Sequence, residues 1–186
     1  MKEFVNYARA NPGKLTYASS GPGTGSQVEM ELLKRALNID VLEIPYKSTS
    51  QAVTDLLGGQ VSAYTAALPS VAQHVRSGRA RAIALVSMAR SPLFPDIQSV
   101  PEGLGRPDYV SSPNWYALYA HSRTPSSIVT VLQKQVQQIM RSPAMREQLE
   151  GFGAQSVDST VEDLTAQMHS DVRRYIEVGK VLGLRK

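Results

Sequence analysis

The sequence predicts an α/β fold with a mainly parallel sheet, and three observations support this prediction. Strand-like segments alternate with segments whose apolar residues follow helical spacing along the first half of the chain. A glycine-rich loop, "SSGPGTGS" at 19–26, joins the first strand-like segment to a helix-like segment. A connector rich in proline and glycine at 88–113 then precedes a mostly helical half, which indicates two lobes.

The first half has clear start and stop signals. The chain opens with a short helix that Asn11, Pro12 and Gly13 stop, and a later helix ends at Gly58 and Gly59. The expected strands are 14–19, 41–46, 61–68 and 80–87, and the helices that separate them are 26–37, 48–59 and 69–78.

The second half is expected to add helices and two further strands. A short helix is expected within the connector at 100–104, and the longer helices are 124–142, 144–153 and 160–183. The segment "NWYALYAH" at 114–121 is typical of a strand, and 154–157 fits a short edge strand. Trp115, Tyr116 and Tyr119 fit either a packed core or the lining of a cleft.

Composition excludes several classes of protein. The chain has no cysteine, so disulfides, cysteine-ligated metals and thiol nucleophiles are excluded. No apolar run approaches the length of a membrane-spanning helix. Glu3 and Asn6 interrupt the first residues, which therefore do not resemble a signal peptide. The formal net charge of +4 comes without interleaved aromatic residues, so we expect no nucleic-acid partner.

We expect neither a catalytic site nor a metal site. The three histidines, His74, His121 and His169, have no recognisable nucleophile or acid partner in the sequence, and no two of them have metal-ligand spacing. The adjacent acidic residues Glu162 and Asp163 fit the start of a helix rather than an acid–base pair. The sequence therefore predicts no enzyme activity, no catalytic residue, no metal and no cofactor.

The glycine-rich loop is the sharpest candidate site. A loop between a strand and a helix places backbone N–H groups at the positive end of the helix, where anions bind. A dinucleotide-binding fingerprint would need a third glycine where Ser26 stands, and a P-loop would need a lysine that this loop lacks. A carboxylate site and a tight glycine turn without a ligand both stay open on the spacing alone.

A linked set of motifs resembles one family over nearly the whole chain. The motifs are "NPGKL", "SSGPGT", "PYK", "DLLGGQV", "LPS" and "SGRARAIA". As a set they resemble the substrate-binding family of tripartite tricarboxylate transporters, the TctC or Bug-type periplasmic solute receptors. The resemblance implies a type II periplasmic-binding-protein-like fold, with one complete lobe at 11–110 and part of a second lobe at 1–10 and 111–186.

The resemblance also implies a function. Members of this family are solute receptors for small carboxylates, which include di- and tricarboxylates, amino acids and aromatic acids, and a membrane permease completes the uptake. We therefore expect a periplasmic receptor for a small carboxylate. Two alternatives stay open, a cytoplasmic ligand-sensing domain of the same fold and a small α/β enzyme.

The family's carboxylate loop maps onto the glycine-rich loop of this chain. The ligand-binding residues implied by the resemblance are Ser20, Gly21, Gly23, Thr24, Ser26, Thr65 and Ala66. We expect the N–H groups of Gly23 to Ser26 to face a cleft, and the Thr24 hydroxyl to contact the ligand. Many relatives carry histidine where this chain has Gln27, and Asp-Asn is common where it has Thr65, Ala66 and Ala67.

The resemblance further implies that family receptors extend beyond the N-terminal end of this chain. The segment that precedes "NPGKL" in such receptors carries the first strands and helices of one lobe and a second carboxylate loop. We therefore expect the chain to behave as a partial receptor that binds small dicarboxylates weakly. We also predict a homodimer whose interface involves residues 111–186, since lone strands there would leave apolar faces uncovered.

Overall fold

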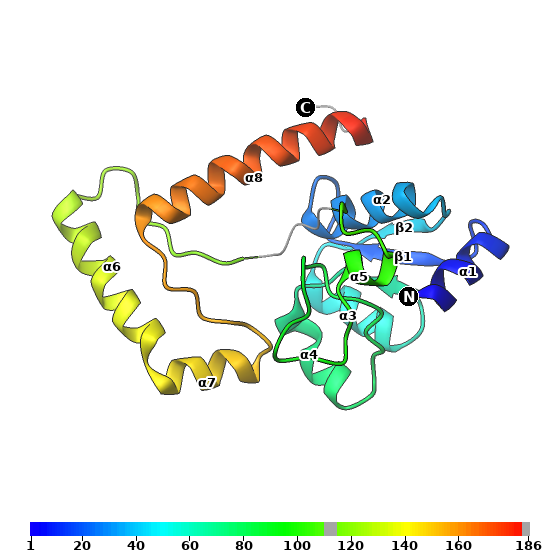
Figure 1. The fold of residues 1–186 in the computed structure, drawn as a ribbon, viewed down its shortest axis with the longest axis horizontal. Coiled ribbons are helices and arrows are strands. Elements are labelled where there is room, and N and C mark those ends of the chain that lie inside the picture. Colours follow the sequence, from blue (N-terminus) through cyan, green and yellow to red (C-terminus); the bar gives the residue numbers. More distant parts are fainter. Residues whose placement is uncertain (110–114, 184–186) are drawn as a thin grey trace. The chain divides into compact units, whose positions relative to one another are not determined.

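The computed structural model describes residues 1–109 and 115–183. The chain divides into two compact units, Met1–Asn114 and Trp115–Lys186 (Figure 1). Within the described residues, no helix combines the length and the apolar character needed to cross a membrane.

A parallel sheet of three strands forms the centre of the first unit. The strands are β1 (Thr16–Ser19), β2 (Leu42–Pro45) and β3 (Ala63–Tyr64). Their order is β2-β1-β3, with β1 in the middle and both neighbours parallel to it. The predicted strands at 14–19, 41–46 and 61–68 are thus confirmed in type and place, although each is shorter than predicted.

Five helices belong to the described part of the first unit. They are α1 (Lys2–Ala10), α2 (Gly25–Leu37), α3 (Thr49–Leu57), α4 (Leu68–Arg76) and the short α5 (Val100–Leu104). Local signals set several of their ends. The Ser48 hydroxyl accepts the N–H of Gln51 and so caps α3, and Asn38 adopts the left-handed conformation that ends α2.

Alternation along β1 divides the core between the two faces of the sheet. Tyr17 is fully buried among α1 and α2, where it joins Val5 and Met30 in one apolar cluster. Ala18 points to the other face and packs with Ala52 of α3. Figure 1 shows α2 and α3 on opposite sides of the strands. Two successive residues of one short strand therefore anchor both helical layers.

The predicted buried strand at 80–87 is wrong. In this segment only Leu85 forms a bridge, to Ser99, in which the Leu85 N–H donates to the carbonyl of Gln98 and the Leu85 carbonyl accepts the N–H of Val100. Its apolar composition favours a strand, but a strand also needs a neighbour along its length. One bridge is all that the described residues provide.

The second unit contains α6 (Ser126–Arg141), α7 (Pro143–Gly151) and α8 (Val161–Leu182). The last helix begins where the sequence predicts, because Thr160 and Asp163 form a reciprocal capping box at its start. Polar contacts hold the linking segments to the helices. For example, the Arg141 guanidinium pairs with Asp158, and the Ser156 hydroxyl donates to the carbonyl of Met140.

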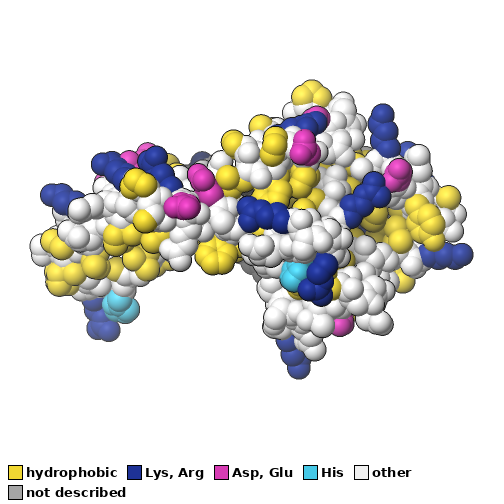
Figure 2. All heavy atoms as spheres, turned by 90° about the horizontal axis from the view of Figure 1, so that it is seen from below, with side chains coloured by type: hydrophobic (Ala, Val, Ile, Leu, Met, Phe, Trp, Pro, Cys, Tyr) yellow, Lys and Arg dark blue, Asp and Glu magenta, His cyan; other side chains and the backbone are white. Residues whose placement is uncertain are grey.

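The strands predicted at 114–121 and 154–157 are wrong for the residues that the structure describes. Residues 115–121 and 154–157 have no strand partner there, so their alternating side chains have no ladder to stabilise them. None of the apolar side chains described between 115 and 180 is buried. Figure 2 shows apolar side chains, in yellow, at the molecular surface. Residue 114 of the first of these predictions lies outside the described part.

The helix at the start of the chain packs in the first unit. Val5 and Ala8 of α1 are buried in the same cluster as Tyr17. In the sequence, the boundary between the two compact units falls between Asn114 and Trp115. The assignment of 1–10 and 111–186 to the second lobe, and of 11–110 to the first, concerns a complete two-lobed receptor and stays a prediction.

Candidate functional site

The glycine-rich loop lies where α/β proteins usually bind ligands. It follows the carboxyl end of β1, the central strand of the sheet. The chain passes from β1 to β2 on one side and then crosses to β3 on the other side, so the loops after β1 and β3 leave the sheet at a topological switch point. Ligands of open α/β sheets bind in the crevice at such a point.

Two glycines give the loop its shape. Gly21 has φ of 101° and Gly23 has φ of 75°, which are left-handed conformations that other residues seldom adopt. The Thr24 hydroxyl closes the turn between them by donating to the Gly21 carbonyl at 2.7 Å. Thr24 is the residue that precedes α2, but its side chain makes no capping hydrogen bond there.

Four amides of the loop are bonded internally. The N–H of Ser20 donates to the Ser26 hydroxyl at 2.9 Å, and that of Gly21 to the Ser19 hydroxyl at 3.1 Å. The Gly23 amide donates to Gln27 Oε1 at 2.7 Å, and the Thr24 amide to the Gly21 carbonyl at 3.3 Å. The amides of Gly23 and Thr24, expected to face a ligand, are therefore already occupied by acceptors in this structure.

The next three amides are available instead. Within the described residues, the N–H groups of Gly25, Ser26 and Gln27 have no acceptor. They form the first turn of α2, a helix of 13 residues, whose positive end adds to the attraction for an anion. The hydroxyls of Thr24 and Ser26 lie 3.1 Å apart beside this turn. The arrangement can accept a carboxylate without a side-chain cation.

A buried network supports the loop from the sheet side. Glu43 of β2 accepts the Ser19 hydroxyl at 2.5 Å on Oε1 and the Gln27 side-chain amide at 2.9 Å on Oε2. Ser19 is fully buried and Gln27 nearly so. On sequence alone, Gln27 is only a departure from relatives, and Ser19 and Glu43 are not among the predicted site residues. The signal that could have indicated Ser19 and Glu43 is a polar residue in each of two neighbouring parallel strands.

The second predicted segment lies at the same edge of the sheet. Thr65 and Ala66 directly follow β3, whose Tyr64 pairs with Ala18 in the parallel register. Tyr64, which the sequence analysis did not select, brings its hydroxyl within 3.4 Å of the Ser20 hydroxyl. The structure thus brings the ends of β1 and β3 together, but among the described residues no hydrogen bond joins Thr65 or Ala66 to the loop.

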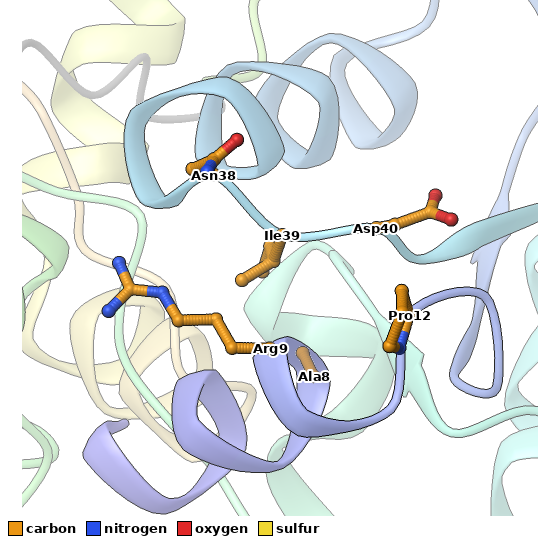
Figure 3. A pocket seen from close by; sticks show the side chains of 6 residues that line it. All are labelled: Ala8, Arg9, Pro12, Asn38, Ile39 and Asp40. Atoms are coloured by element: carbon orange, nitrogen blue, oxygen red, sulfur yellow. The ribbon is translucent and has the colours of Figure 1, made fainter.

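Two surface pockets of about 530 Å³ lie in the first unit, and neither is lined by a loop residue. Figure 3 shows the first, lined by Ala8, Arg9, Pro12, Asn38, Ile39 and Asp40. These residues precede β1 and β2, so the pocket is at the amino end of the strands, opposite the switch point. The Arg9 guanidinium donates to the Leu37 carbonyl at 2.7 Å, which commits it to the end of α2.

Two buried tyrosines of the first unit have perturbed pKa values and a structural role. Burial, together with Glu31 and its hydrogen bond, raises the pKa of Tyr17 far above the ordinary value. Burial and the nearby Glu29 likewise raise the pKa of Tyr109. Both phenols therefore stay neutral at physiological pH. The described residues contain no cluster of side chains suited to a metal ion.

Comparison with known proteins decides the family. The model of the "Tripartite tricarboxylate transporter family receptor", TctC, matches residues 1–184. The chain belongs to this TctC receptor family. BugT of Bordetella pertussis is 32% identical over 182 residues, which are 98% of this chain and 55% of BugT. A protein encoded in the tcbD-tcbE intergenic region of a Pseudomonas strain is 30% identical over 93% of this chain and 51% of its own length.

Solved structures agree with this assignment. An R. palustris protein with adipate has a TM-score of 0.90 at 25% identity, over 98% of this chain and 60% of its own. The periplasmic binding protein BugD has a TM-score of 0.86 at 29% identity, over the whole of this chain and 62% of its own. This TctC-family chain therefore spans about half the length of the curated relatives it matches, and about 60% of these structures.

Several expectations from the sequence are confirmed by these findings. The α/β fold of the periplasmic-binding-protein class is confirmed by the structural matches. The family is one of receptors, which confirms the expectation of a binding protein rather than an enzyme.

Proposed function

We propose that this TctC-family chain is the ligand-binding part of a receptor for a small carboxylate, and that the carboxylate binds at the glycine-rich loop. The observation that carries the proposal is the open first turn of α2. The N–H groups of Gly25, Ser26 and Gln27 have no acceptor among the described residues and lie at a topological switch point. The R. palustris relative with adipate supports a dicarboxylate as the ligand.

The proposed contacts follow from the geometry. One carboxylate oxygen takes the amides of the first turn, and the hydroxyls of Ser20 and Ser26, on either side of the Gly23 turn, assist it. Gly21, Gly23 and Thr24 shape the loop rather than donate to the ligand. Thr65 and Ala66 line the neighbouring side of the switch point and would contact the body of the ligand.

The proposal extends to partners and place of action. As a member of a transporter receptor family, the protein would deliver its ligand to the membrane permease of a tripartite transporter, from the periplasm. The apolar surface of the second unit supports self-association, so we include a homodimer in the proposal. Cytoplasmic ligand sensing would use the same loop, and it differs only in the partner.

Calorimetric titration with adipate tests the ligand class. We expect a one-to-one complex with a Kd in the high micromolar to millimolar range, because this loop holds only one end of a dicarboxylate. The uncharged diamide of adipate is the matched control and should not bind, since it offers no negative charge to the helix end. Equal affinity for the acid and the diamide, or no heat with any dicarboxylate, would contradict the proposal.

A further inference from the structure

The network behind the loop has a fixed direction. An ionised carboxylate can only accept hydrogen bonds, so Glu43 must face the Nε2 hydrogens of Gln27. That orientation turns Oε1 of Gln27 toward the loop, where it accepts the Gly23 N–H at 2.7 Å. The charge of Glu43 thus decides which end of the Gln27 amide meets the loop.

The same carboxylate also fixes the start of the loop. Its other oxygen accepts the Ser19 hydroxyl hydrogen, which leaves the Ser19 oxygen to accept the Gly21 N–H at 3.1 Å. The amides of both left-handed glycines, Gly21 and Gly23, are therefore held by side chains that Glu43 orients. Ser19 and Gln27 are buried, so breaking either bond would leave a polar group without water.

We propose that Glu43 and Gln27 are positioning residues for the anion loop. Glu43 orients Gln27, Gln27 holds the Gly23 amide, and the amides of Gly25, Ser26 and Gln27 stay open for the ligand. The negative charge stays one side chain away from the Gly21 and Gly23 amides, where it shapes the site without facing the bound anion. This inference rests on the proposed carboxylate site, and its first readout does not depend on a ligand.

Exchanging the two side chains gives a sharp test. In the double variant Gln27→Glu with Glu43→Gln, every hydrogen bond can form again. The carboxylate introduced at position 27 accepts the Gly23 N–H. The amide introduced at position 43 donates its hydrogens to that carboxylate, and its oxygen accepts the Ser19 hydroxyl. In Glu43→Gln alone, the new amide has one acceptor oxygen for two donors. If this oxygen accepts the Ser19 hydroxyl, the new hydrogens face those of Gln27, which must turn over and lose the Gly23 N–H. If it accepts from Gln27, the Ser19 hydroxyl loses its acceptor. In Gln27→Glu alone, two carboxylates meet.

Amide hydrogen exchange on the full chain reads the network directly. We expect slow exchange at Gly21 and Gly23 in the parent, at least tenfold faster exchange at one of these two amides in each single variant, and recovery in the double variant. Unchanged protection at both amides in Glu43→Gln, or no recovery in the double variant, would overturn the positioning role. Thr54→Ser, remote from the loop on α3, is the matched control and should leave Gly23 unchanged.

Adipate titration then separates the two proposals. We expect the double variant to bind adipate at least tenfold more weakly than the parent, although the hydrogen bonds of its loop are restored. The reason is that the negative charge now lies at position 27, against the Gly23 amide and next to the bound anion. Parent-like affinity in the double variant would overturn the claim that the charge must stay at residue 43. If the parent binds no carboxylate while Gly23 exchange behaves as expected, the proposed function fails and the network stands as a structural device only.

Discussion

Trp115 Nε1 donates a hydrogen bond of 2.7 Å to Asp171 Oδ2, and this contact ties the first described residue of the second unit to the middle of α8. Asp171 is nearly buried, and it also accepts the Gln167 amide at 3.1 Å and pairs with Arg174. Among the described residues of the second unit it is the only buried charged side chain. The contact therefore acts as a polar anchor in a unit whose apolar side chains stay at the surface.

Replacing Trp115 with Phe removes this donor and keeps an aromatic ring. We expect the free energy of unfolding to fall by about 1.5 kcal/mol, since a hydrogen bond to a charged acceptor is lost while Asp171 keeps its other partners. Urea unfolding followed by circular dichroism measures the change. Tyr116→Phe is the control, because the Tyr116 side chain is largely exposed. Equal stabilities for the two variants would contradict the anchoring role.

The lowered pKa of Asp171 predicts that the folded protein loses stability in acid. Burial alone would raise the pKa of Asp171, but the hydrogen bonds from Trp115 and Gln167 and the charge of Arg174 outweigh it, and the pKa lies below the ordinary value. The folded state therefore prefers the ionised form, and its stabilising contribution is complete above about pH 4, the usual pKa of an aspartate. It disappears as the pH falls from there through the lowered pKa.

Comparing the parent with Asp171→Asn tests whether the stabilising contribution of Asp171 falls as the pH falls. We expect a difference in unfolding free energy that is constant from pH 7 to about pH 5 and shrinks below about pH 4. Thermal melts across this range provide the measurement. A difference that stays constant down to pH 2.5 would mean that Asp171 titrates alike in the folded and unfolded chain.

The Thr24 hydroxyl is expected to stabilise the loop rather than the ligand. Thr24→Val removes its 2.7 Å bond to the Gly21 carbonyl, so we expect about 0.5–1.5 kcal/mol of lost stability and weaker adipate binding through a less ordered turn. Thr24→Ser keeps the hydroxyl and is the matched control. Thermal melts and calorimetry would contradict this view if Thr24→Val lost affinity for adipate without any loss of stability.

Local signals explain which parts of the fold could be predicted. Ser48, Thr160 and Gly21 act within a few residues of their own position, and the elements that they start or shape lie where the sequence indicates. Strand pairing depends on distant neighbours instead. The apolar segments 80–87 and 115–121 have strand composition but find no ladder among the described residues.

At the candidate site, too, local features could be predicted from the sequence and contacts between distant residues could not. The glycine-rich loop could be located from its sequence, because glycine, proline and serine mark a turn before a helix. Which amides of the loop are free could not be predicted from the sequence. Gln27 and Glu43 are 16 residues apart, and they meet only through the parallel pairing of β1 with β2. The loop sequence therefore predicts that the Gly23 amide faces the ligand, whereas in the structure this amide donates to Gln27.

The apolar surface of the second unit leads to the last prediction, a homodimer. Apolar side chains of its linker, of α6, of α8 and of Phe152, which follows α7, are exposed, including Leu118 at 73%, Val131 at 59% and Phe152 at 53%. Covering a large apolar side chain stabilises by about 1.5–3 kcal/mol, and a stable interface needs about 800 Å² from each partner. In a solution of one protein, a second copy is the surface available to cover these side chains, and a two-fold arrangement covers both copies at once.

Light scattering at micromolar concentration should give twice the mass of one chain. Leu118→Glu should shift the equilibrium toward the monomer, because a carboxylate would have to be buried in the interface. Met88→Glu is the matched control, since Met88 is also exposed at 53% but belongs to the first unit. A parent chain that stays monomeric and melts cooperatively would contradict the prediction, and so would a mass that rises without limit as the concentration increases, because a closed two-fold interface stops at two copies.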